Sequence, residues 1–277
     1  MHLDDSHMVI RKRFGQHFLE PAWVDKVIRA IDPKADDVFI EIGPGGGALT
    51  RPLAARAKSV TAFEIDRDLA AELEASAPAN VTVVQGDFLD IARIGQEPTR
   101  SPTVLRVAGN LPYNVASPIL FKLAELHAAG PPLGDATVML QREVADRLVA
   151  GPGSREYGVL SILIGHSARV EIILKLPAGA FRPPPKVLSA LVRLRFHSPD
   201  PPAQDEAAFA GLVQAVFTRR RKTLANALLA FPPAVTATPA RMLRDAGIDA
   251  ARRPETLSIP EFVRLADTLR RVGTRAG

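Results

Sequence analysis

The stretch VAGNLPYNVASP, residues 107–118, combines unusual side chains at the point where a buried strand is predicted to end. The four residues concerned are Asn110, Leu111, Pro112 and Tyr113. A turn here would ordinarily consist of small polar residues, whereas this one offers a carboxamide, a bulky aliphatic side chain and one of only two tyrosines in the chain. The proline lacks an N–H group and stiffens the turn. The stretch favours a site for a flat ligand that forms hydrogen bonds; the alternative is a proline turn with a buried tyrosine.

A glycine-rich segment, EIGPGGGALT at residues 41–50, ends one predicted strand and opens the helix that follows. Glycine lets the backbone approach a ligand closely, and a helix N-terminus offers unpaired N–H groups. Gly43 and its neighbours also satisfy the loose dinucleotide-binding pattern G-x-G-x-x-A. The segment therefore predicts a ligand but does not by itself identify it.

Two acids stand at the ends of the next two predicted strands. Glu64 lies 21 residues after Gly43, where a carboxylate can accept hydrogen bonds from ribose hydroxyls. Asp87, followed by Phe88, can read an adenine amino group while the phenylalanine packs on the adenine ring. A nicotinamide enzyme would share the glycine loop and the first acid, but nothing in the sequence suggests its pyrophosphate or hydride partners. The alternative is that each acid only caps the helix after it.

These residues depend on a predicted sheet, because apolar β-branched runs alternate with helical stretches from about residue 20 to 197. We predict strands over residues 36–43, 59–66, 80–87, 103–110 and 135–141, buried on both faces, with helices over 49–57 and 67–77. This alternation indicates an α/β fold with a doubly wound, Rossmann-like parallel sheet. Two further strands, 168–176 and 189–197, are predicted to form an antiparallel pair at the end of the sheet.

A polar, proline-rich segment at residues 197–205 marks the predicted domain boundary. Before it we expect one domain over residues 1–199, in which 1–10 form a flexible tail. After it, amphipathic stretches predict a small all-helical domain over residues 200–277.

The composition excludes several classes of chemistry. The 277 residues include no cysteine and six scattered histidines, so there is no disulfide, no thiolate metal site and no paired histidine spacing. We therefore expect no metal. Charges occupy the N-terminus where a signal peptide needs an apolar run, and no apolar run approaches the roughly 18 residues of a membrane span. The sequence predicts a soluble cytoplasmic protein.

The net charge of +5 is concentrated near the two ends of the chain, since residues 200–277 carry 12 Lys and Arg against 8 Asp and Glu. Such clusters suit phosphate backbones, although a solvated helix face is an equal alternative. The two clusters are Arg11, Lys12 and Arg13, and Arg219, Arg220, Arg221 and Lys222.

With its glycine loop, two strand-end acids and Asn-Leu-Pro-Tyr corner, the sequence resembles the adenine-N6 branch of the S-adenosylmethionine-dependent methyltransferases. In that branch the corner holds the target base. The N6 lone pair of adenine is delocalised, so acceptors at the Asn110 side chain and near Leu111 would take its hydrogens and orient the nitrogen. Tyr113 would stack on the base once it is flipped out. No strong base is needed, because the methyl donor is already activated and catalysis is mainly positioning.

The resemblance is closer to one family. From about residue 11 to 271 the chain is similar to the KsgA/Dim1 family of small-subunit rRNA adenine dimethyltransferases. The segments that carry this likeness are RKRFGQHFL (11–19), EIGPGGGALT, FEID (63–66), NLPYNVASP, YGVLSIL (157–163), FRPPPKVLSALVRL (181–194) and RRRKTLANAL (219–228). The resemblance implies dimethylation of N6 of two adjacent adenosines in a hairpin loop near the 3′ end of 16S rRNA. The substrate would be the 30S subunit or its precursor.

The same resemblance implies roles for further residues. His17 and Leu19 would touch the cofactor, with His17 standing where the family usually has asparagine. The other positions that match the family's cofactor-binding residues are Gly43, Glu64, Asp87 and Asn110. Phe181 would offer a second stacking face for the base, the alternative being a phenylalanine that plugs the domain interface. The two basic clusters would contact rRNA phosphates, which position a protein without reading sequence.

Several alternatives remain open. The nearest is the 23S rRNA adenine N6-methyltransferase of the macrolide-resistance type, which shares the fold and the corner. A ribosome-assembly factor without turnover, or a mitochondrial transcription factor, could keep the fold without the chemistry. A DNA adenine methyltransferase commonly carries a recognition domain for which the C-terminal part is too small. We expect a monomer with no DNA or membrane partner.

Overall fold

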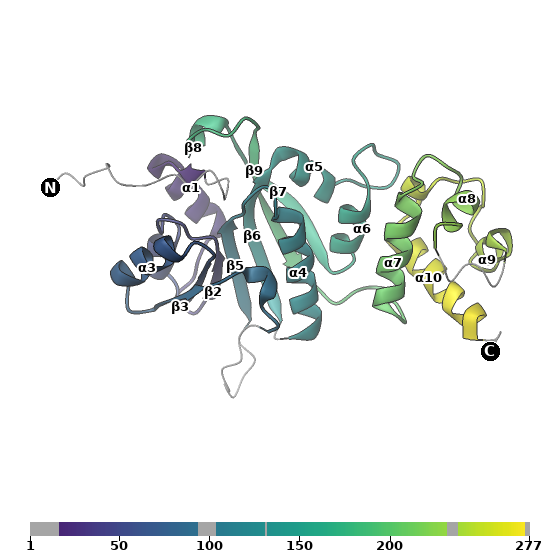
Figure 1. Ribbon diagram of the computed structural model, residues 1–277, viewed down its shortest axis with the longest axis horizontal. Helices are drawn as coiled ribbons and strands as arrows, with labels where there is room; N and C mark the ends of the chain where they lie inside the picture. The colour runs from purple at the N-terminus through teal and green to yellow at the C-terminus, as the bar shows by residue number, and fades with distance from the viewer. Residues whose placement is uncertain (1–16, 94–103, 131, 232–237, 275–277) are drawn as a thin grey trace. The chain divides into compact units, whose positions relative to one another are not determined.

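The computed structural model describes residues 17–93, 104–130, 132–231 and 238–274, and the chain divides into two compact units (Figure 1). The first comprises Met1–Ala145 and Glu171–Phe196, and the second Asp146–Val170 and His197–Gly277. The second unit therefore begins earlier in the chain than the predicted boundary at residue 200. The reason is that Tyr157 and Ile162 are buried in the apolar core of the second unit.

The first unit is built on a seven-stranded sheet in the order β4-β3-β2-β5-β6-β9-β7. The strands are β2 (Val38–Ile42), β3 (Ser59–Glu64), β4 (Val81–Gln85), β5 (Leu105–Asn110), β6 (Leu133–Gln141), β7 (Ala168–Leu176) and β9 (Ser189–Phe196). From β4 to β6 each neighbouring pair is parallel, and β9 runs antiparallel to β6. The predicted α/β, Rossmann-like fold is confirmed. Because the strand order reverses between β2 and β5, ligands are expected beside their carboxyl ends.

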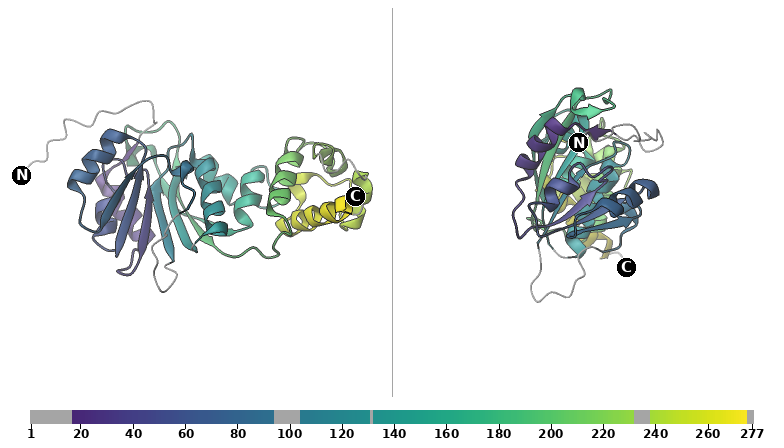
Figure 2. Two further views of the ribbon diagram at one scale, coloured as in Figure 1. Left: turned by 60° about the horizontal axis from the view of Figure 1, so that its bottom comes forward. Right: turned by 90° about the vertical axis from the view of Figure 1, so that its left-hand side faces the viewer.

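Helices lie on both sides of this sheet (Figure 2). They are α1 (Pro21–Ile31), α2 (Thr50–Ala54), α3 (Arg67–Ser76), α4 (Ala116–Ala129) and α5 (Arg142–Leu148), with short 3-10 turns η2 (Phe88–Asp90) and η3 (Ala178–Ala180). Residues of α1 and α2 share one buried cluster with Phe39, Met139 and Leu191 of the strands. The central strands are buried as predicted, whereas β4 at the sheet edge is only half-buried.

A two-stranded piece that the sequence did not predict ties the N-terminal segment down. It pairs β1 (Phe18–Leu19) with β8 (Phe181–Arg182) in antiparallel register, and the Glu20 N–H donates to the Ala180 carbonyl at 2.9 Å. Strands of two residues carry no visible pattern, so this pairing depends on segments about 160 residues apart in the chain.

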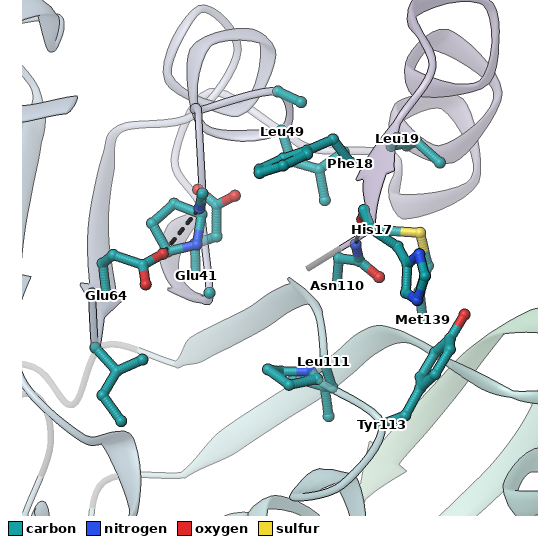
Figure 3. Close-up of a pocket in the computed structure, with 16 residues that line it drawn as sticks. His17, Phe18, Leu19, Glu41, Leu49, Glu64, Asn110, Leu111, Tyr113 and Met139 are labelled. Atoms are coloured by element: carbon teal, nitrogen blue, oxygen red, sulfur yellow. Dashed lines mark hydrogen bonds between the residues drawn. The ribbon is translucent and has the colours of Figure 1, made fainter. Parts of the chain in front are cut away.

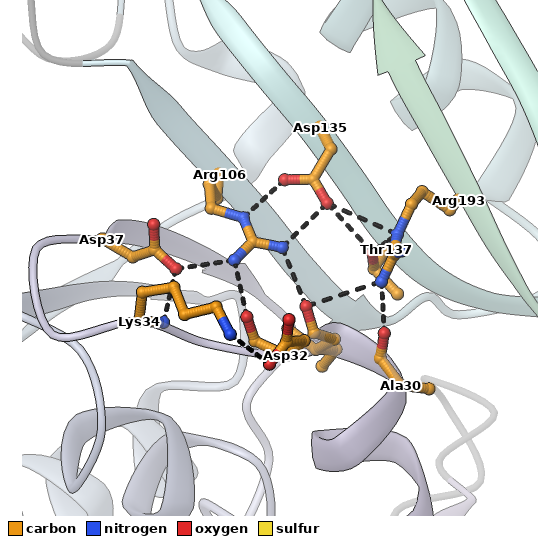
Figure 4. A network of polar contacts seen from close by, with 9 residues as sticks. Ala30, Asp32, Lys34, Asp37, Arg106, Asp135, Thr137 and Arg193 are labelled. Atoms are coloured by element: carbon orange, nitrogen blue, oxygen red, sulfur yellow. Dashed lines mark hydrogen bonds and ion pairs between the residues drawn. The ribbon is translucent and has the colours of Figure 1, made fainter.

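A polar network lies at the amino ends of the strands (Figure 4). The Arg106 guanidinium forms ion pairs with Asp135 and Asp37 at 2.6 Å each, and also donates to the Ile31 carbonyl at 2.8 Å. Arg193 adds a donor to the Ala30 carbonyl. The last carbonyls of a helix have no partner within the helix and carry partial negative charge. The two arginines therefore satisfy the end of α1 and join it to the sheet.

The second unit contains the helices of the C-terminal part. These are α6 (Val159–Gly165), α7 (Glu206–Phe217), α8 (Leu224–Leu228), α9 (Pro239–Asp245) and α10 (Ile259–Thr274), with the 3-10 turn η5 (Pro254–Thr256). A turn at residues 218–223 separates α7 from α8. The predicted helical character is confirmed. Within the described residues, no helix is long and apolar enough to cross a membrane.

Candidate functional site

A cleft opens at the carboxyl ends of β2, β3 and β5 (Figure 3). Eight residues singled out from the sequence line it: His17, Leu19, Gly43, Glu64, Asn110, Leu111, Pro112 and Tyr113. The structure thus brings the predicted cofactor loop and the predicted base-holding corner into one site. Phe18, Glu41 and Ile65 also line the cleft, although the sequence analysis did not select them.

The glycine loop is held by Glu64. Gly45 has φ of 54° and Gly43 has φ of 68°, values that favour glycine over residues with a Cβ atom. The Gly45 N–H donates to Glu64 Oε2 at 3.0 Å, and the Asp66 N–H donates to Oε1 at 2.9 Å. Each carboxylate oxygen keeps lone-pair capacity for a ligand hydroxyl. Burial raises the pKa of Glu64.

The alternative that each strand-end acid only caps the following helix does not hold for Glu64 but holds for Asp87. Asp66, not Glu64, caps α3, because its Oδ1 accepts from the Asp68 N–H at 3.0 Å. Asp87 does cap its own turn, accepting from the Leu89 N–H at 2.9 Å. Phe88 is 4% exposed and packs edge-on against Phe63, so neither Asp87 nor Phe88 is part of the cleft lining. Their contact with an adenine ring stays a prediction.

The corner after β5 is tied to the N-terminal segment. Asn110 Nδ2 donates to the His17 carbonyl at 2.7 Å, which fixes the orientation of the carboxamide and leaves Oδ1 as an acceptor (Figure 3). Leu111 is buried, and its N–H donates to the Met139 carbonyl at 3.3 Å. The corner therefore presents its polar groups from a backbone that is held on two sides.

His17 lies over the ring of Tyr113. Their ring centroids are 5.5 Å apart with an interplanar angle of 30°. His17 Nδ1 lies 2.7 Å from the Pro183 carbonyl, an acceptor, so this nitrogen carries the hydrogen. The Tyr113 hydroxyl lies 2.7 Å from Ser189 Oγ. His17 thus contacts both the tyrosine and the proline-rich loop, while its predicted contact with a cofactor stays a prediction.

Glu41 is the main site residue that the sequence analysis missed. Its side chain is 1% exposed, and among the described residues its Oε2 has no hydrogen-bond partner. Burial raises its pKa to about 7. A buried carboxyl group is stabilised by a counter-charge or a hydrogen bond, so Glu41 is a candidate to receive a cationic or hydrogen-bonding group of a ligand in the cleft. The available signal was an acid between two isoleucines of a buried strand.

Ile65 is the second missed residue. It follows Glu64 directly and is 44% exposed, although it lines the cleft. An exposed isoleucine beside the Glu64 carboxylate offers an apolar surface on which a flat ring could pack.

Replacing Glu41 with glutamine is expected to stabilise the protein at pH 8. In the native state the raised pKa means that Glu41 stays protonated to about pH 7, whereas the unfolded chain ionises near 4.5. Below pH 4.5 both states are protonated and Glu41 does not lower the free energy of unfolding. As the pH rises from 4.5 to 7 that free energy falls by roughly 3 kcal/mol. Glu41→Gln removes this loss, which denaturant unfolding at pH 5.5 and 8 would measure. A difference between variant and wild type that is the same at both pH values would contradict this account.

Replacing Gly109 with alanine is expected to separate β2 from β5. A Cβ atom at Gly109 would lie 2.5 Å from the Ile42 carbonyl oxygen, a backbone atom that cannot rotate away. Overpacking of this kind costs about 1–3 kcal/mol, and the shift would reach the glycine loop that follows Ile42. Thermal unfolding and cofactor titration would measure both effects. Gly179→Ala is the matched control, since a Cβ there meets nothing within 4 Å; equal effects in the two variants would contradict the steric explanation.

The predicted second stacking residue does not offer a free face in the structure. Phe181 is 2% exposed and belongs to the core cluster, where β8 pairs it with Leu19 of β1. The ring is buried in this structure, and its role as a second stacking face for the base stays a prediction.

The second basic cluster lies in the turn between α7 and α8. Arg219, Arg221 and Lys222 are exposed. Arg220 instead lies 3.5 Å from Glu255 and donates to the Ser154 carbonyl at 3.1 Å. Three of the four predicted phosphate contacts are thus available at the surface. Arg11, Lys12 and Arg13 lie outside the described residues.

Comparison with known proteins gives one consistent assignment. Residues 8–270 match the family described as ribosomal RNA adenine dimethylase. This chain belongs to that family. Curated relatives named "Ribosomal RNA small subunit methyltransferase A" include one from Acinetobacter baylyi, 43% identical over 94% of this chain and 92% of its own length. Another, from Chromobacterium violaceum, is 43% identical over 98% and 99%.

Two solved structures resemble this member of the dimethylase family. A dimethyladenosine transferase from Plasmodium falciparum has a TM-score of 0.74 at 26% identity, covering 90% of this chain and 96% of its own. The 23S rRNA methyltransferase ErmE has a TM-score of 0.64 at 28% identity, covering 91% and 99%. The predicted family and the predicted enzyme class, an rRNA adenine dimethyltransferase, are confirmed.

Proposed function

We propose that this dimethylase transfers methyl groups from S-adenosylmethionine to N6 of two adjacent adenosines near the 3′ end of 16S rRNA. The observation that carries the proposal is the oriented carboxamide of Asn110. It lies in the same cleft as the glycine loop at Gly43 and the carboxylate of Glu64 that holds this loop. The relatives at 43% identity are named for the small ribosomal subunit, which supports this choice of RNA.

The cleft fits S-adenosylmethionine in its donor set. Glu64 would accept from the ribose hydroxyls, because both its oxygens are already aimed by backbone N–H groups. Glu41 would face the ammonium group, which would give its buried Oε2 the partner that the described residues do not supply. Ile65 and Asp87 would contact the adenine, the former by its exposed apolar surface. When bound, the cofactor supplies a methyl group on a positively charged sulfur.

The corner would hold the target base. Asn110 Oδ1 and the backbone carbonyl near Leu111 would accept the two N6 hydrogens, while Tyr113 would stack on the flipped ring. The His17 carbonyl sets the Asn110 carboxamide before substrate arrives, so little reorganisation is needed at the moment of transfer. After methyl transfer the alkylated amine is strongly acidic, so water or a nearby carbonyl suffices to accept its remaining proton.

The exposed cations Arg219, Arg221 and Lys222 would contact rRNA phosphates of the 30S subunit or its precursor. The second unit would accordingly bind rRNA, and the protein would act as a monomer in the cytoplasm, where subunits assemble. The fold also resembles a 23S rRNA methyltransferase, so methylation of the large subunit is the second candidate.

The deciding experiment incubates the protein with labelled S-adenosylmethionine and with small subunits that lack the dimethyl marks, and with large subunits in parallel. Mass spectrometry of the digested RNA should find dimethyladenosine in the small-subunit sample alone. Label in large-subunit RNA would support the second candidate. Cofactor binding without label in either sample would indicate an assembly factor without turnover.

A further inference from the structure

The ring of Tyr113 is held at its far end by a residue that the mechanism above does not use. Its hydroxyl lies 2.7 Å from the Ser189 Oγ. Tyr113 stands in the turn after β5, whereas Ser189 is the first residue of β9, two places further along the sheet. The contact therefore joins the corner to a different strand rather than to its own turn.

Ser189 is a polar exception in an apolar environment. Its side chain is 1% exposed, and the three residues after it, Ala190, Leu191 and Val192, are fully buried. Burying a hydroxyl costs free energy unless it forms a hydrogen bond. Within the described part of the chain, the one side-chain hydrogen bond of Ser189 is the bond to Tyr113. An alanine would serve the core of β9 as well, so the hydroxyl is explained by Tyr113.

The other contact of the Tyr113 ring is its stack with His17, and a bound base could replace it. His17 stacks on the ring, but His17 is the first described residue of the chain and lies just before the two-residue strand β1. A base that stacks on Tyr113 competes with His17 for the same ring. The hydroxyl contact with Ser189 lies at the ring's end, so it can persist when a base replaces the imidazole.

We propose that Ser189 is a positioning residue for methyl transfer, which holds the end of the Tyr113 ring so that the stacked base meets the methyl group in line. This inference rests on the proposed function, in which Tyr113 stacks on the target adenine. Transfer depends on the geometry of the reacting atoms, so a ring that can swing lowers the rate without weakening the cofactor.

The test compares Ser189→Ala, Tyr113→Phe and the double variant on small subunits that lack the dimethyl marks, at saturating S-adenosylmethionine. Each single variant should lower the single-turnover rate about tenfold, since each removes the same hydrogen bond. The double variant should be no slower than either single one, because the bond is already lost. The Kd for S-adenosylmethionine should change less than about twofold. Ser167→Ala is the control: among the described residues, this buried hydroxyl has no hydrogen-bond partner, and the rate should stay that of the wild type.

A spectroscopic signature separates positioning from a general structural effect. The chain has only two tyrosines, so protein labelled with ¹³Cζ-tyrosine should give two signals, assigned by the Tyr113→Phe variant. Ser189→Ala should move the Tyr113 signal and leave that of Tyr157, whose hydroxyl donates to the Leu257 carbonyl at 2.9 Å.

The outcomes distinguish this inference from the proposed function. A Ser189→Ala enzyme with the wild-type rate, beside an inactive Tyr113→Ala enzyme, would overturn the role of Ser189 and leave the base-holding corner intact. Additive losses in the double variant, or an unmoved Tyr113 signal, would also overturn it. Full activity of Tyr113→Ala would overturn the proposed stacking itself.

Discussion

Asn110→Ala is expected to lower the rate of dimethyladenosine formation by about 10²–10³-fold, the usual cost of removing one preorganised polar group from a reacting centre. The Asn110 side chain has two tasks in the structure. Its Nδ2 donates to the His17 carbonyl at 2.7 Å, and in the proposed function its Oδ1 accepts from the N6 amino group. Alanine removes both, so N6 loses its orientation toward the methyl group. The measurement is single-turnover methylation of small subunits.

Asn110→Asp sharpens this prediction. The carboxylate keeps an acceptor of the same shape but cannot donate to the His17 carbonyl, so it should also be slow. Cofactor affinity should fall far less than the rate in both variants. Asn80→Ala is the matched control, because the Asn80 Nδ2 donates to the carbonyls of Ala54 and Ala57 at the opposite end of the strands. It should lower stability with kcat unchanged; a normal rate for Asn110→Ala would refute the proposed role of the corner.

Arg106→Met is expected to lower the free energy of unfolding by about 3 kcal/mol, the lower end of the cost of breaking a buried ion pair. The Arg106 side chain is 17% exposed, and its removal leaves Asp135 and Asp37, at 12% and 19%, without their closest cation. It also removes the shorter of the two hydrogen bonds to the Ile31 carbonyl at the end of α1, leaving the one from Arg193 Nη2 at 3.5 Å. The loss stays near the lower end because Arg193 remains 3.6 Å from Asp135. Denaturant unfolding at neutral pH measures it.

Two further variants serve as comparisons for Arg106→Met. Arg106→Lys should recover little, since an ammonium cannot reproduce the planar fork that reaches two carboxylates and a carbonyl. Arg195→Met removes an exposed pair with Glu171, 3.2 Å apart and about half exposed, and should cost under about 1 kcal/mol. Equal losses of unfolding free energy in the Arg106→Met and Arg195→Met variants would show that burial does not determine how much this network stabilises the protein.

The sequence by itself determined the sheet and the meeting of the main site residues. Each central strand is an apolar run whose pattern is local, and the βα alternation forces parallel pairing. The carboxyl ends of parallel strands lie at one edge, so Gly43, Glu64 and Asn110 had to come together once the strands were recognised. The position of each residue at a strand end was sufficient for this, without knowledge of any side-chain contact.

Only the tertiary structure decided which side chains hold the site in place. The pairing of β1 with β8 brings His17 to Asn110 and buries Phe181, and β9 brings Ser189 to Tyr113. The Arg106 network likewise joins α1 to the sheet. In each case the stabilising partner is far away in the chain, and one member alone looks like an ordinary core or surface residue. Each of these contacts stabilises the protein only when both of its residues are present. A local pattern in the sequence shows one residue at a time and therefore does not reveal the contact.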